Sequence, residues 1–338
     1  MGRTIQILLV TIILTALVYP LTATAQKSRH ALNNKKHHAD SLPGVLWREP
    51  KDLTSRNLYD GPGGREHAPK GRLTFLKEDH DGSNPKFVVR DEQGGKWKVK
   101  LGQEARSETA ATRIVWAAGY FTDEDYYVPV LKVEDMKRLS RGQEFVAPDG
   151  TIRGARLERD RKGEKKIDHW SWFENPFTGT REMNGLKVMM ALINNWDLKE
   201  DNNSIYEEKN GERRFVVTDL GATFGKTGNT LTRSRGVTED YIHSEFIRKV
   251  RPDRVDFVLH SRPFFLLAVN MPYYCERTRM ESIVKDIPRA DARWLGQLLA
   301  RLSDQQIRDA FRAAGYALPE TEACTRTLRQ RITALTKL

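Results

Sequence analysis

Two carboxylates and one amide in the second half of the chain have the residue types that bind a magnesium ion. Asp197 and Asn202 lie in the segment Asp-Leu-Lys-Glu-Asp-Asn, and Asp219 begins the segment Asp-Leu-Gly. Mg²⁺ prefers oxygen ligands, and a carboxylate with an amide oxygen supplies them without over-neutralising the ion. Each segment alone is short, and Asp197 and Asn202 also suit a helix cap or a turn. The order of the segments along the chain therefore matters more than either segment.

The neighbouring elements place these residues in a defined order. An apolar helix is predicted over residues 186–194, and a hairpin with its turn at Asn210-Gly211 follows the first polar segment. The second hairpin strand runs directly into Asp219. This order resembles the catalytic core of protein kinases, because Asp-Leu-Lys-x-x-Asn is similar to the kinase catalytic loop and Asp-Leu-Gly is similar to the Asp-Phe-Gly element.

The resemblance implies a role for each polar residue. Asp197 would accept the proton of the acceptor's hydroxyl group, and Lys199 would stabilise charge on the transferred phosphoryl group. Asn202 and Asp219 would be the ligands of the Mg²⁺ that bridges the phosphates of ATP. The implied cofactors are therefore ATP and Mg²⁺.

An earlier part of the chain supplies the lysine and the carboxylate that a kinase fold requires. The segment Lys-Leu-Gly-Gln-Glu-Ala-Arg-Ser-Glu, which begins at Lys100, is similar to a pattern of the phosphoinositide-kinase branch. The resemblance implies that Lys100 holds the phosphates and that Glu108, at the start of a helix, is its ion-pair partner, with Glu104 as the competing carboxylate. Lys96, Lys98 and Lys100 share one side of the strand, which is also typical of a solvated face.

Several departures from ordinary Ser/Thr kinases point to atypical kinases, a group that includes phosphoinositide, secretory-pathway and small-molecule kinases. Trp196 stands where an Arg usually precedes the catalytic Asp, and no Ala-Pro-Glu segment follows Gly221. The sequence has no Gly-x-Gly-x-x-Gly loop. Residues 81–84 either cover the phosphates or form a plain hairpin turn. The resemblance covers about residues 73–225.

The predicted elements form the two lobes of an α+β, protein-kinase-like fold. The N-lobe, residues 71–160, is predicted to be a small strand-rich unit with one helix. Its strands are predicted at residues 72–76, 87–90, 96–100, 126–133 and 152–157, and its helix at residues 107–118.

The C-lobe, residues 161–338, is predicted to contain the Asp-Leu-Lys and Asp-Leu-Gly segments and to become mainly helical after Tyr241. Ser303 and Gln306 form a capping-box pattern at the start of one helix. Apolar residues at helical spacing mark the buried face of the last helix, namely Cys324, Leu328, Ile332 and Leu335.

The first 25 residues have the composition of a signal peptide. Arg3 supplies the positive charge, Ile5 to Val18 form the apolar stretch, and the small residues at 22–25 suit cleavage before Gln26. An uncleaved signal anchor is the alternative, because the apolar stretch is nearly long enough to span a bilayer. We therefore expect an exported protein, periplasmic or secreted, or one that this segment anchors in the membrane.

Residues 26–70 are expected to form a polar, poorly ordered lead-in, because they are rich in Lys, His, Asn, Asp and Gly. One short packed piece is expected around residues 45–47. His37 and His38, with His30 nearby, suit either a solvated linker or a metal site.

Three further groups of residues leave two interpretations open. Trp170 and Trp172 either line a ligand cleft or pack in the core between the lobes. In an oxidising compartment Cys275 and Cys324 permit one disulfide, and otherwise they are structural thiols. A basic stretch either binds an anionic ligand or forms a solvated helix face, and its members are Arg248, Lys249, Arg251 and Arg254.

The charge of the chain favours anionic partners. The 338 residues include 56 Lys and Arg against 45 Asp and Glu, a formal net charge of +11. Such a surface suits nucleotides, phospholipid headgroups, nucleic acid or acidic glycans. No zinc-finger spacing, RNP-like strand or basic heptad region is present, so no specific nucleic acid is expected. Gly-x-Ser-x-Gly, His-Glu-x-x-His and Cys-x-x-Cys segments are also absent from the sequence, so hydrolase and zinc-enzyme chemistry lack support.

The sequence thus predicts an exported atypical kinase-like phosphotransferase that moves the γ-phosphoryl group of Mg-ATP to a hydroxyl acceptor on a protein, a lipid or a small molecule. One alternative is a kinase-fold pseudoenzyme, a binding module of the cell envelope without turnover, because the periplasm is not expected to hold much free ATP. Another is a basic envelope protein that binds acidic glycan or lipid through its surface charge. Membrane contact is expected only through an uncleaved signal segment.

Overall fold

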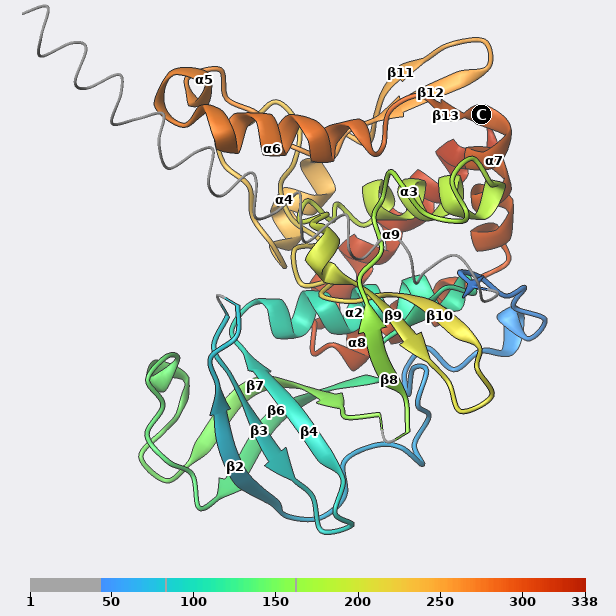
Figure 1. Cartoon of the computed structure of the whole chain (residues 1–338). Helices are drawn as coiled ribbons and strands as arrows, with labels where there is room; N and C mark the ends of the chain where they lie inside the picture. Colours follow the sequence, from blue (N-terminus) through green and yellow to red (C-terminus); the bar gives the residue numbers. More distant parts are fainter. Residues whose placement is uncertain (1–43, 83, 162) are drawn as a thin grey trace, which may run out of the picture. The chain divides into compact units, whose positions relative to one another are not determined.

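A computed structural model describes residues 44–82, 84–161 and 163–338 of the chain. The predicted signal peptide, the His37-His38 pair and the first part of the lead-in lie outside these residues. Strands dominate the first half of the described chain and helices the last (Figure 1), which confirms the α+β class with a strand-rich N-terminal part and a mainly helical C-terminal part. Within the described ranges, no helix is long and apolar enough to cross a membrane.

Five strands of the N-terminal part close into a barrel in the order β2-β3-β4-β7-β6, with β2 and β6 paired in parallel. Alternate residues of β3 and β4 are buried in the barrel, as the period-two pattern predicts. The turn between β3 and β4 has Gly94 at φ 78°, a value that glycine adopts without strain. The barrel strands are β2 (Leu73–Asp79), β3 (Lys86–Arg90), β4 (Lys96–Leu101), β6 (Asp125–Glu134) and β7 (Thr151–Arg159).

The helix that follows β4 begins earlier than the sequence predicts. Helix α2 (Glu104–Ala117) starts three residues before the expected Ser107. Gly102, at φ 83°, lets the chain leave β4 and enter the helix almost at once. Glu108 therefore lies in the second turn of α2 rather than at its start. This earlier start of the helix places the Glu108 side chain beside the end of β4.

A second sheet lies next to the barrel and carries the hairpin predicted around Asn210-Gly211. The hairpin strands β9 and β10 pair as expected, and Gly211 in their turn has φ 81°. The order is β1-β10-β9-β8, and β5 also pairs with β10. The strands are β1 (Gly44–Val45), β5 (Phe121–Thr122), β8 (Lys165–Asp168), β9 (Asn203–Glu207) and β10 (Arg213–Val217).

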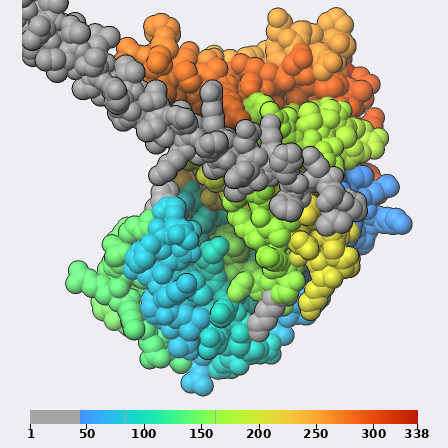
Figure 2. Space-filling view, viewed as in Figure 1, coloured from blue at the N-terminus to red at the C-terminus, as the bar shows by residue number. Residues whose placement is uncertain are grey.

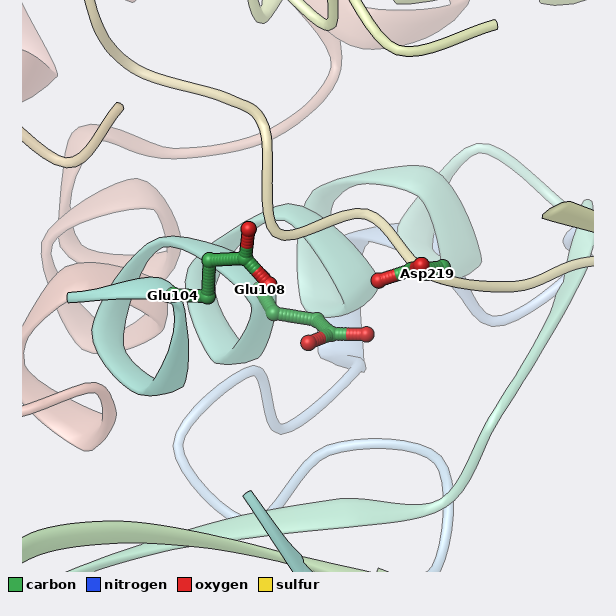
Figure 3. Close-up of side chains that lie close together, drawn as sticks. All are labelled: Glu104, Glu108 and Asp219. Atoms are coloured by element: carbon green, nitrogen blue, oxygen red, sulfur yellow. The ribbon is translucent and has the colours of Figure 1, made fainter. Parts of the chain in front are cut away.

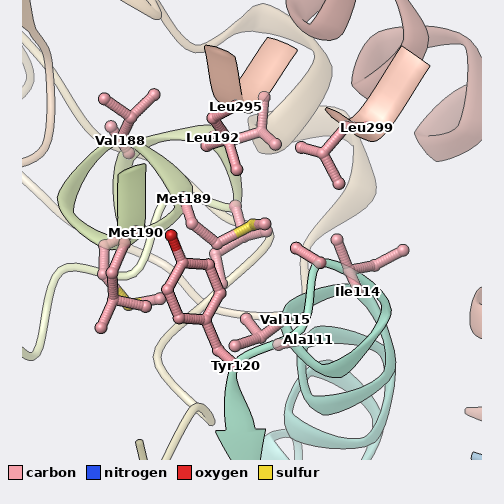
Figure 4. Close-up of a cluster of buried hydrophobic side chains, with 14 of the residues drawn as sticks. Ala111, Ile114, Val115, Tyr120, Val188, Met189, Met190, Leu192, Leu295 and Leu299 are labelled. Atoms are coloured by element: carbon pink, nitrogen blue, oxygen red, sulfur yellow. The ribbon is translucent and has the colours of Figure 1, made fainter. Parts of the chain in front are cut away.

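Helix α3 (Arg181–Leu192) is the apolar helix predicted over residues 186–194, and it begins five residues earlier. Figure 4 shows its Met189 and Met190 among side chains of α2 and α7, with Val115 of α2 close by. All of these side chains are fully buried. This shared core joins α2, and with it Glu108, to the helix that leads into the Asp197 segment.

The C-terminal part is mainly helical and includes the two helices expected near its end. Ser303 and Gln306 form the predicted capping box of α8, and the expected apolar face of α9 is buried. Helices α5 and α6 lie in a different part of the visible face from the barrel strands (Figure 2). The helices are α4 (Thr238–His243), α5 (Leu266–Val269), α6 (Met271–Ser282), α7 (Arg289–Ala300), α8 (Asp304–Ala313) and α9 (Leu318–Thr336).

One stretch expected to be helical is instead a small antiparallel sheet. It consists of β11 (Ile247–Val250), β12 (Arg254–Phe257) and β13 (Ile287–Pro288). Within β12, Val255 and Phe257 are buried while Arg254 and Asp256 are only partly buried, which is the period of a strand. The basic residues of this stretch are therefore not on a helix face, and the prediction of a solvated helix is wrong.

The lead-in was expected to be poorly ordered as far as residue 70, apart from one short packed piece around residues 45–47, but the packing of residues 44–70 against the rest of the chain extends beyond that piece. Leu46, Leu53 and Leu58 are at most 2% exposed. The indole Nε1 of Trp47 donates a hydrogen bond of 2.7 Å to the carbonyl oxygen of Ala118. The packed piece at residues 45–47 is confirmed. The burial of Leu53 and Leu58 was not predicted, because the polar composition of the segment was a poor guide to its packing.

Burial and geometry decide two further alternatives, those for the tryptophan pair and for the two cysteines. Trp170 and Trp172 are 3% and 1% exposed and pack edge to face at 4.8 Å, so they belong to the core. Cys275 is exposed, Cys324 is buried, and both are free thiols. The permitted disulfide between them is therefore not formed.

Candidate functional site

Lys100 joins three elements of the fold through its ammonium group. Its Nζ lies 2.8 Å from Oε2 of Glu108 on α2 and 2.6 Å from Oδ1 of Asp219, which follows β10. The Lys100 side chain is only 8% exposed, whereas that of Lys98 on the same strand is 40% exposed. The three lysines of β4 therefore do not form one solvated face, and Lys100 is the member that contacts the predicted site residues.

Glu108 rather than Glu104 is the nearer partner of Lys100. Glu104 lies 3.5 Å from the same Nζ and forms its own ion pair with Arg235 and a hydrogen bond with Asn84. Figure 3 shows Glu104 and Glu108 on α2 and Asp219 on the loop beside it. The oxygens of these three carboxylates lie within 4.8 Å of one another. Because Lys100 already occupies the position of a cation among them, we do not assign this group as a separate metal site.

Glu108 is held by a buried charge network that reaches into the barrel. Its second oxygen, Oε1, lies 3.0 Å from Arg156, a residue of β7 that also pairs with Asp125 and Glu158. Burial raises the pKa of Glu108 to about 7, and the charges of Arg156 and Lys100 oppose that rise. The network therefore orients Glu108 towards Lys100 and limits the cost of burying its charge.

The Asp219 side chain points into the site from a strained backbone. Its φ of 52° lies in the left-handed region, where a residue with a Cβ is uncommon. Burial acts to raise the pKa of Asp219, but the charge of Lys100, its hydrogen bond to Asp219 and the charges of Arg156 and Lys86 together lower the pKa below its ordinary value. Asp219 is therefore ionised at neutral pH, and its half-exposed carboxylate is available to a second cation.

Asn202 is tied to the same strand end. The backbone carbonyl of Asn202 accepts hydrogen bonds from the backbone N–H and the hydroxyl group of Thr218, the residue before Asp219. The side-chain Nδ2 of Asn202 donates a bond of 2.8 Å to the carbonyl oxygen of Asp197. This bond uses the amide nitrogen and leaves the amide oxygen for a ligand. Asn202 and Asp219 thus fit the donor set that Mg²⁺ requires.

Asp197 and Lys199 lie at the more open side of the site. Lys199 Nζ is 3.2 Å from Oδ1 of Asp197, and their side chains are 51% and 25% exposed. Burial acts to lower the pKa of Lys199, but the charge of Asp197 and a hydrogen bond with it raise the pKa above its ordinary value. Lys199 is therefore charged at neutral pH, and both side chains are accessible to a ligand.

A cavity of about 700 Å³ opens on the same side of β4, and sequence analysis did not predict it. Its lining includes Lys98 and Glu158, which form an ion pair at 3.2 Å, and the buried Asp123. Burial, reinforced by the charge of Glu158, raises the pKa of Asp123 to about 7. The period-two lysines of β4 were the available signal, because Lys98 shares its side of the strand with Lys100. The volume suits a ligand of nucleotide size.

The chain after Asp219 folds back onto the Asp197 segment. The indole Nε1 of Trp196 donates a bond of 2.8 Å to the carbonyl oxygen of Ser234, and Arg233 stacks on the Trp196 ring at 3.9 Å. Gly225 permits this close return, because a Cβ there would overlap the backbone of Ser234. Trp196 thus anchors the returning segment in a chain without an Ala-Pro-Glu element.

Comparisons with known proteins find similar folds but no similar sequence. No protein-family model matches the chain, and no curated protein sequence matches it significantly. The Helicobacter pylori proinflammatory kinase CtkA is similar in structure at 11% identity, with 80% of this chain and 98% of that chain covered and a TM-score of 0.42.

Two further solved structures are also similar. The Golgi casein kinase matches at 11% identity over 85% of this chain and 74% of its own, with a TM-score of 0.38. The amicoumacin kinase hAmiN, solved with AMP-PNP, Ca²⁺ and Ami, matches at 11% identity over 78% and 88%, with a TM-score of 0.24. These values are low, so the function of this chain has to be argued from the side chains of its own site.

Proposed function

We propose that the chain is a kinase-like phosphotransferase that transfers the γ-phosphoryl group of Mg-ATP to a hydroxyl acceptor. The observation that carries this proposal is the bridge formed by Lys100 between Glu108 and Asp219. A buried lysine oriented by a helix carboxylate, beside a second carboxylate at a strand end, suits the binding of phosphates together with a metal ion. Neither a helix cap nor a turn requires this arrangement.

The residues of the site divide the tasks of phosphoryl transfer. In this proposal the cavity beside Lys98 holds the nucleoside, and Lys100 moves from Asp219 to the phosphates. Asn202 and Asp219 would hold the Mg²⁺, which supplies positive charge to the phosphate oxygens. Asp197 accepts the proton of the acceptor hydroxyl as it attacks, and Lys199 stabilises charge on the transferred group.

Thermal unfolding of the purified chain with and without Mg-ATP tests the nucleotide site. A ligand at about a hundred times its Kd adds roughly 2.7 kcal/mol to the free energy of unfolding. We expect a magnesium-dependent rise in Tm that is lost in Asp219→Ala. Asp201→Ala is the matched control, because Asp201 is an exposed carboxylate of the same loop. An equal rise in both variants would contradict the assignment of Asp219.

Turnover separates an enzyme from a binding module. We expect the wild-type chain to form ADP from Mg-ATP, slowly without an acceptor and faster with one. Nucleotide binding without any ADP formation, across a screen of hydroxyl acceptors, would replace the phosphotransferase with the pseudoenzyme alternative.

Export is a separate part of the proposal. It is supported by Arg3, the apolar stretch from Ile5 to Val18 and the small residues that follow. Expression in a bacterium, followed by N-terminal sequencing of the periplasmic or secreted protein, tests it. A mature chain that begins at Gln26 supports cleavage, whereas an intact chain in the membrane fraction supports an anchor.

A further inference from the structure

A cluster of two arginines and one histidine lies beside the residue that precedes Asp197. Its members are Arg233, on the returning segment, Arg277, on α6, and His260, after β12, and we call them the arginine cluster. Tyr273 lies between the two arginines, because its hydroxyl accepts a hydrogen bond from Arg233 and its ring lies 5.3 Å from the guanidinium of Arg277. Segments distant in the sequence therefore meet here.

The two arginines of the cluster lack carboxylate partners. Across residues 44–82, 84–161 and 163–338, neither Arg233 nor Arg277 has a carboxylate oxygen within 4.0 Å. Arg277 donates to the hydroxyl of Ser261 at 2.8 Å, but its Nε has no hydrogen-bond partner although the residue is only 4% exposed. A buried guanidinium is normally paired, so this one has unused donor capacity.

Within the described chain, His260 also lacks hydrogen-bond partners, and it does so at both ring nitrogens. The residue is 3% exposed. Burial, followed by the charges of Arg233 and Arg277, lowers the pKa of His260 well below its ordinary value, so the ring is neutral at pH 7. A buried imidazole without partners costs free energy that an incoming hydrogen-bonding group would recover.

The cluster is electrostatically unfavourable as it stands. Burial and the nearby charge of Arg277 both lower the pKa of Arg233. The carboxylates that oppose this effect, Asp197 and Glu276, act from beyond ion-pair distance. An anion that contacts both guanidiniums would offset their repulsion and accept hydrogen bonds from their unused N–H donors. Because two full positive charges meet there, a dianion fits better than a single carboxylate.

The position of the cluster indicates which ligand carries the anion. Arg233 lies over the ring of Trp196, and Asp197 is the next residue. Arg233 and Tyr273 are half-buried, so the cluster reaches the surface at their side. We propose that the arginine cluster binds a phosphate group carried by the acceptor and so positions the acceptor's hydroxyl group near Asp197. The identification of this ligand as the acceptor rests on the phosphotransferase function proposed above. The existence of a phosphate site does not depend on that function.

Calorimetric titration of the full chain with inorganic phosphate and with glycerol 3-phosphate tests the site. We expect both probes to bind, glycerol 3-phosphate more tightly, and acetate at least tenfold more weakly. Arg233→Gln should weaken phosphate binding at least tenfold. Arg277→Gln should have the same effect if this variant folds. Arg279→Gln is the matched control, because Arg279 is an exposed arginine of the same helix and should change affinity less than twofold.

Each result has one meaning. Equal weakening in Arg233→Gln and Arg279→Gln, or no phosphate binding by the wild-type chain, would overturn the site. Tighter binding of inorganic phosphate than of glycerol 3-phosphate would overturn its assignment to the acceptor and indicate a site for free phosphate. Phosphate binding that survives in Lys100→Met excludes the nucleotide site as its location. Because Arg233→Gln should keep the Mg-ATP shift in Tm, failure of the nucleotide site and failure of this site are distinguishable.

Discussion

Lys100 and Asp197 belong to one candidate site, but the fold holds their surroundings in different ways. On the barrel side, Lys100, Glu108 and Arg156 are nearly inaccessible and form a continuous set of ion pairs. On the loop side, Asp197 and Lys199 form a single pair whose members are 25% and 51% exposed. Charges interact strongly in a buried environment, whereas water and salt weaken an exposed pair.

This difference implies that substitutions on the two sides should affect different properties of the protein. The barrel side is part of the folded core, so a substitution there should lower the free energy of unfolding more than it lowers the rate of the reaction. The loop side contributes little to stability and leaves its charges available to a ligand. A site of this kind has a preset phosphate-binding half and an adaptable acceptor half.

Replacing the central cation of the barrel network should have the largest effect. Arg156→Leu leaves Glu108 and Asp125 buried without their shared partner, and we expect a loss of about 3–5 kcal/mol in the free energy of unfolding. Urea unfolding measures it. Arg153→Leu is the matched control, because Arg153 is an exposed residue of the same strand. Similar stability in the two variants would remove the contrast between the two sides.

Replacing the proposed base, Asp197, should lower turnover without changing the stability of the fold. Asp197→Asn keeps the shape of the side chain but cannot accept the hydroxyl proton, so we expect ADP formation with an acceptor to fall about a hundredfold or more. The Tm and the Mg-ATP shift should stay as in the wild type. Asp201→Asn serves as the control in the same loop. A large loss of stability in Asp197→Asn would place this residue in the folded core instead.

The lysine beside the base should have a smaller effect on the same reaction. Lys199→Ala removes one exposed positive charge near the transferred group, and we expect kcat to fall roughly tenfold, or about 1.4 kcal/mol in activation free energy. Lys209→Ala, an exposed lysine of the β9–β10 turn, should leave kcat unchanged. Equal losses in both variants would show a general effect of net charge.

The smallest expected effect is the contribution of Asp219 to stability, which should depend on pH. A carboxyl group whose pKa is lowered on folding stabilises the fold above its unfolded pKa, and this contribution is lost as the pH falls through its folded pKa. We therefore expect the difference in unfolding free energy between wild type and Asp219→Asn to shrink as the pH falls from about 5 to about 2. A difference that stays constant over this range would mean that the Lys100–Asp219 pair does not stabilise the fold.

Local patterns predicted most of the elements that surround the site. Alternation in β3 and β4, the Asn210-Gly211 turn and the Ser303 capping box each act over a few residues, and each was confirmed. The sheet of β11 and β12 was missed, because its buried positions are few and its surface residues are strongly basic. Of the packing of residues 44–70, only the piece at residues 45–47 was predicted, because the rest depends on partners far along the chain.

The sequence by itself determined the residue types of the site and their order, because the spacing of Asp197, Asn202 and Asp219 around one hairpin is a local property. Only the tertiary structure decided that Glu108 rather than Glu104 is the nearer partner of Lys100, and that Arg156 supports it. It also brought Arg233, Arg277 and His260 together next to Trp196. Pairing between distant side chains depends on which of them lose contact with water when the chain folds, and no short pattern in the sequence records that loss.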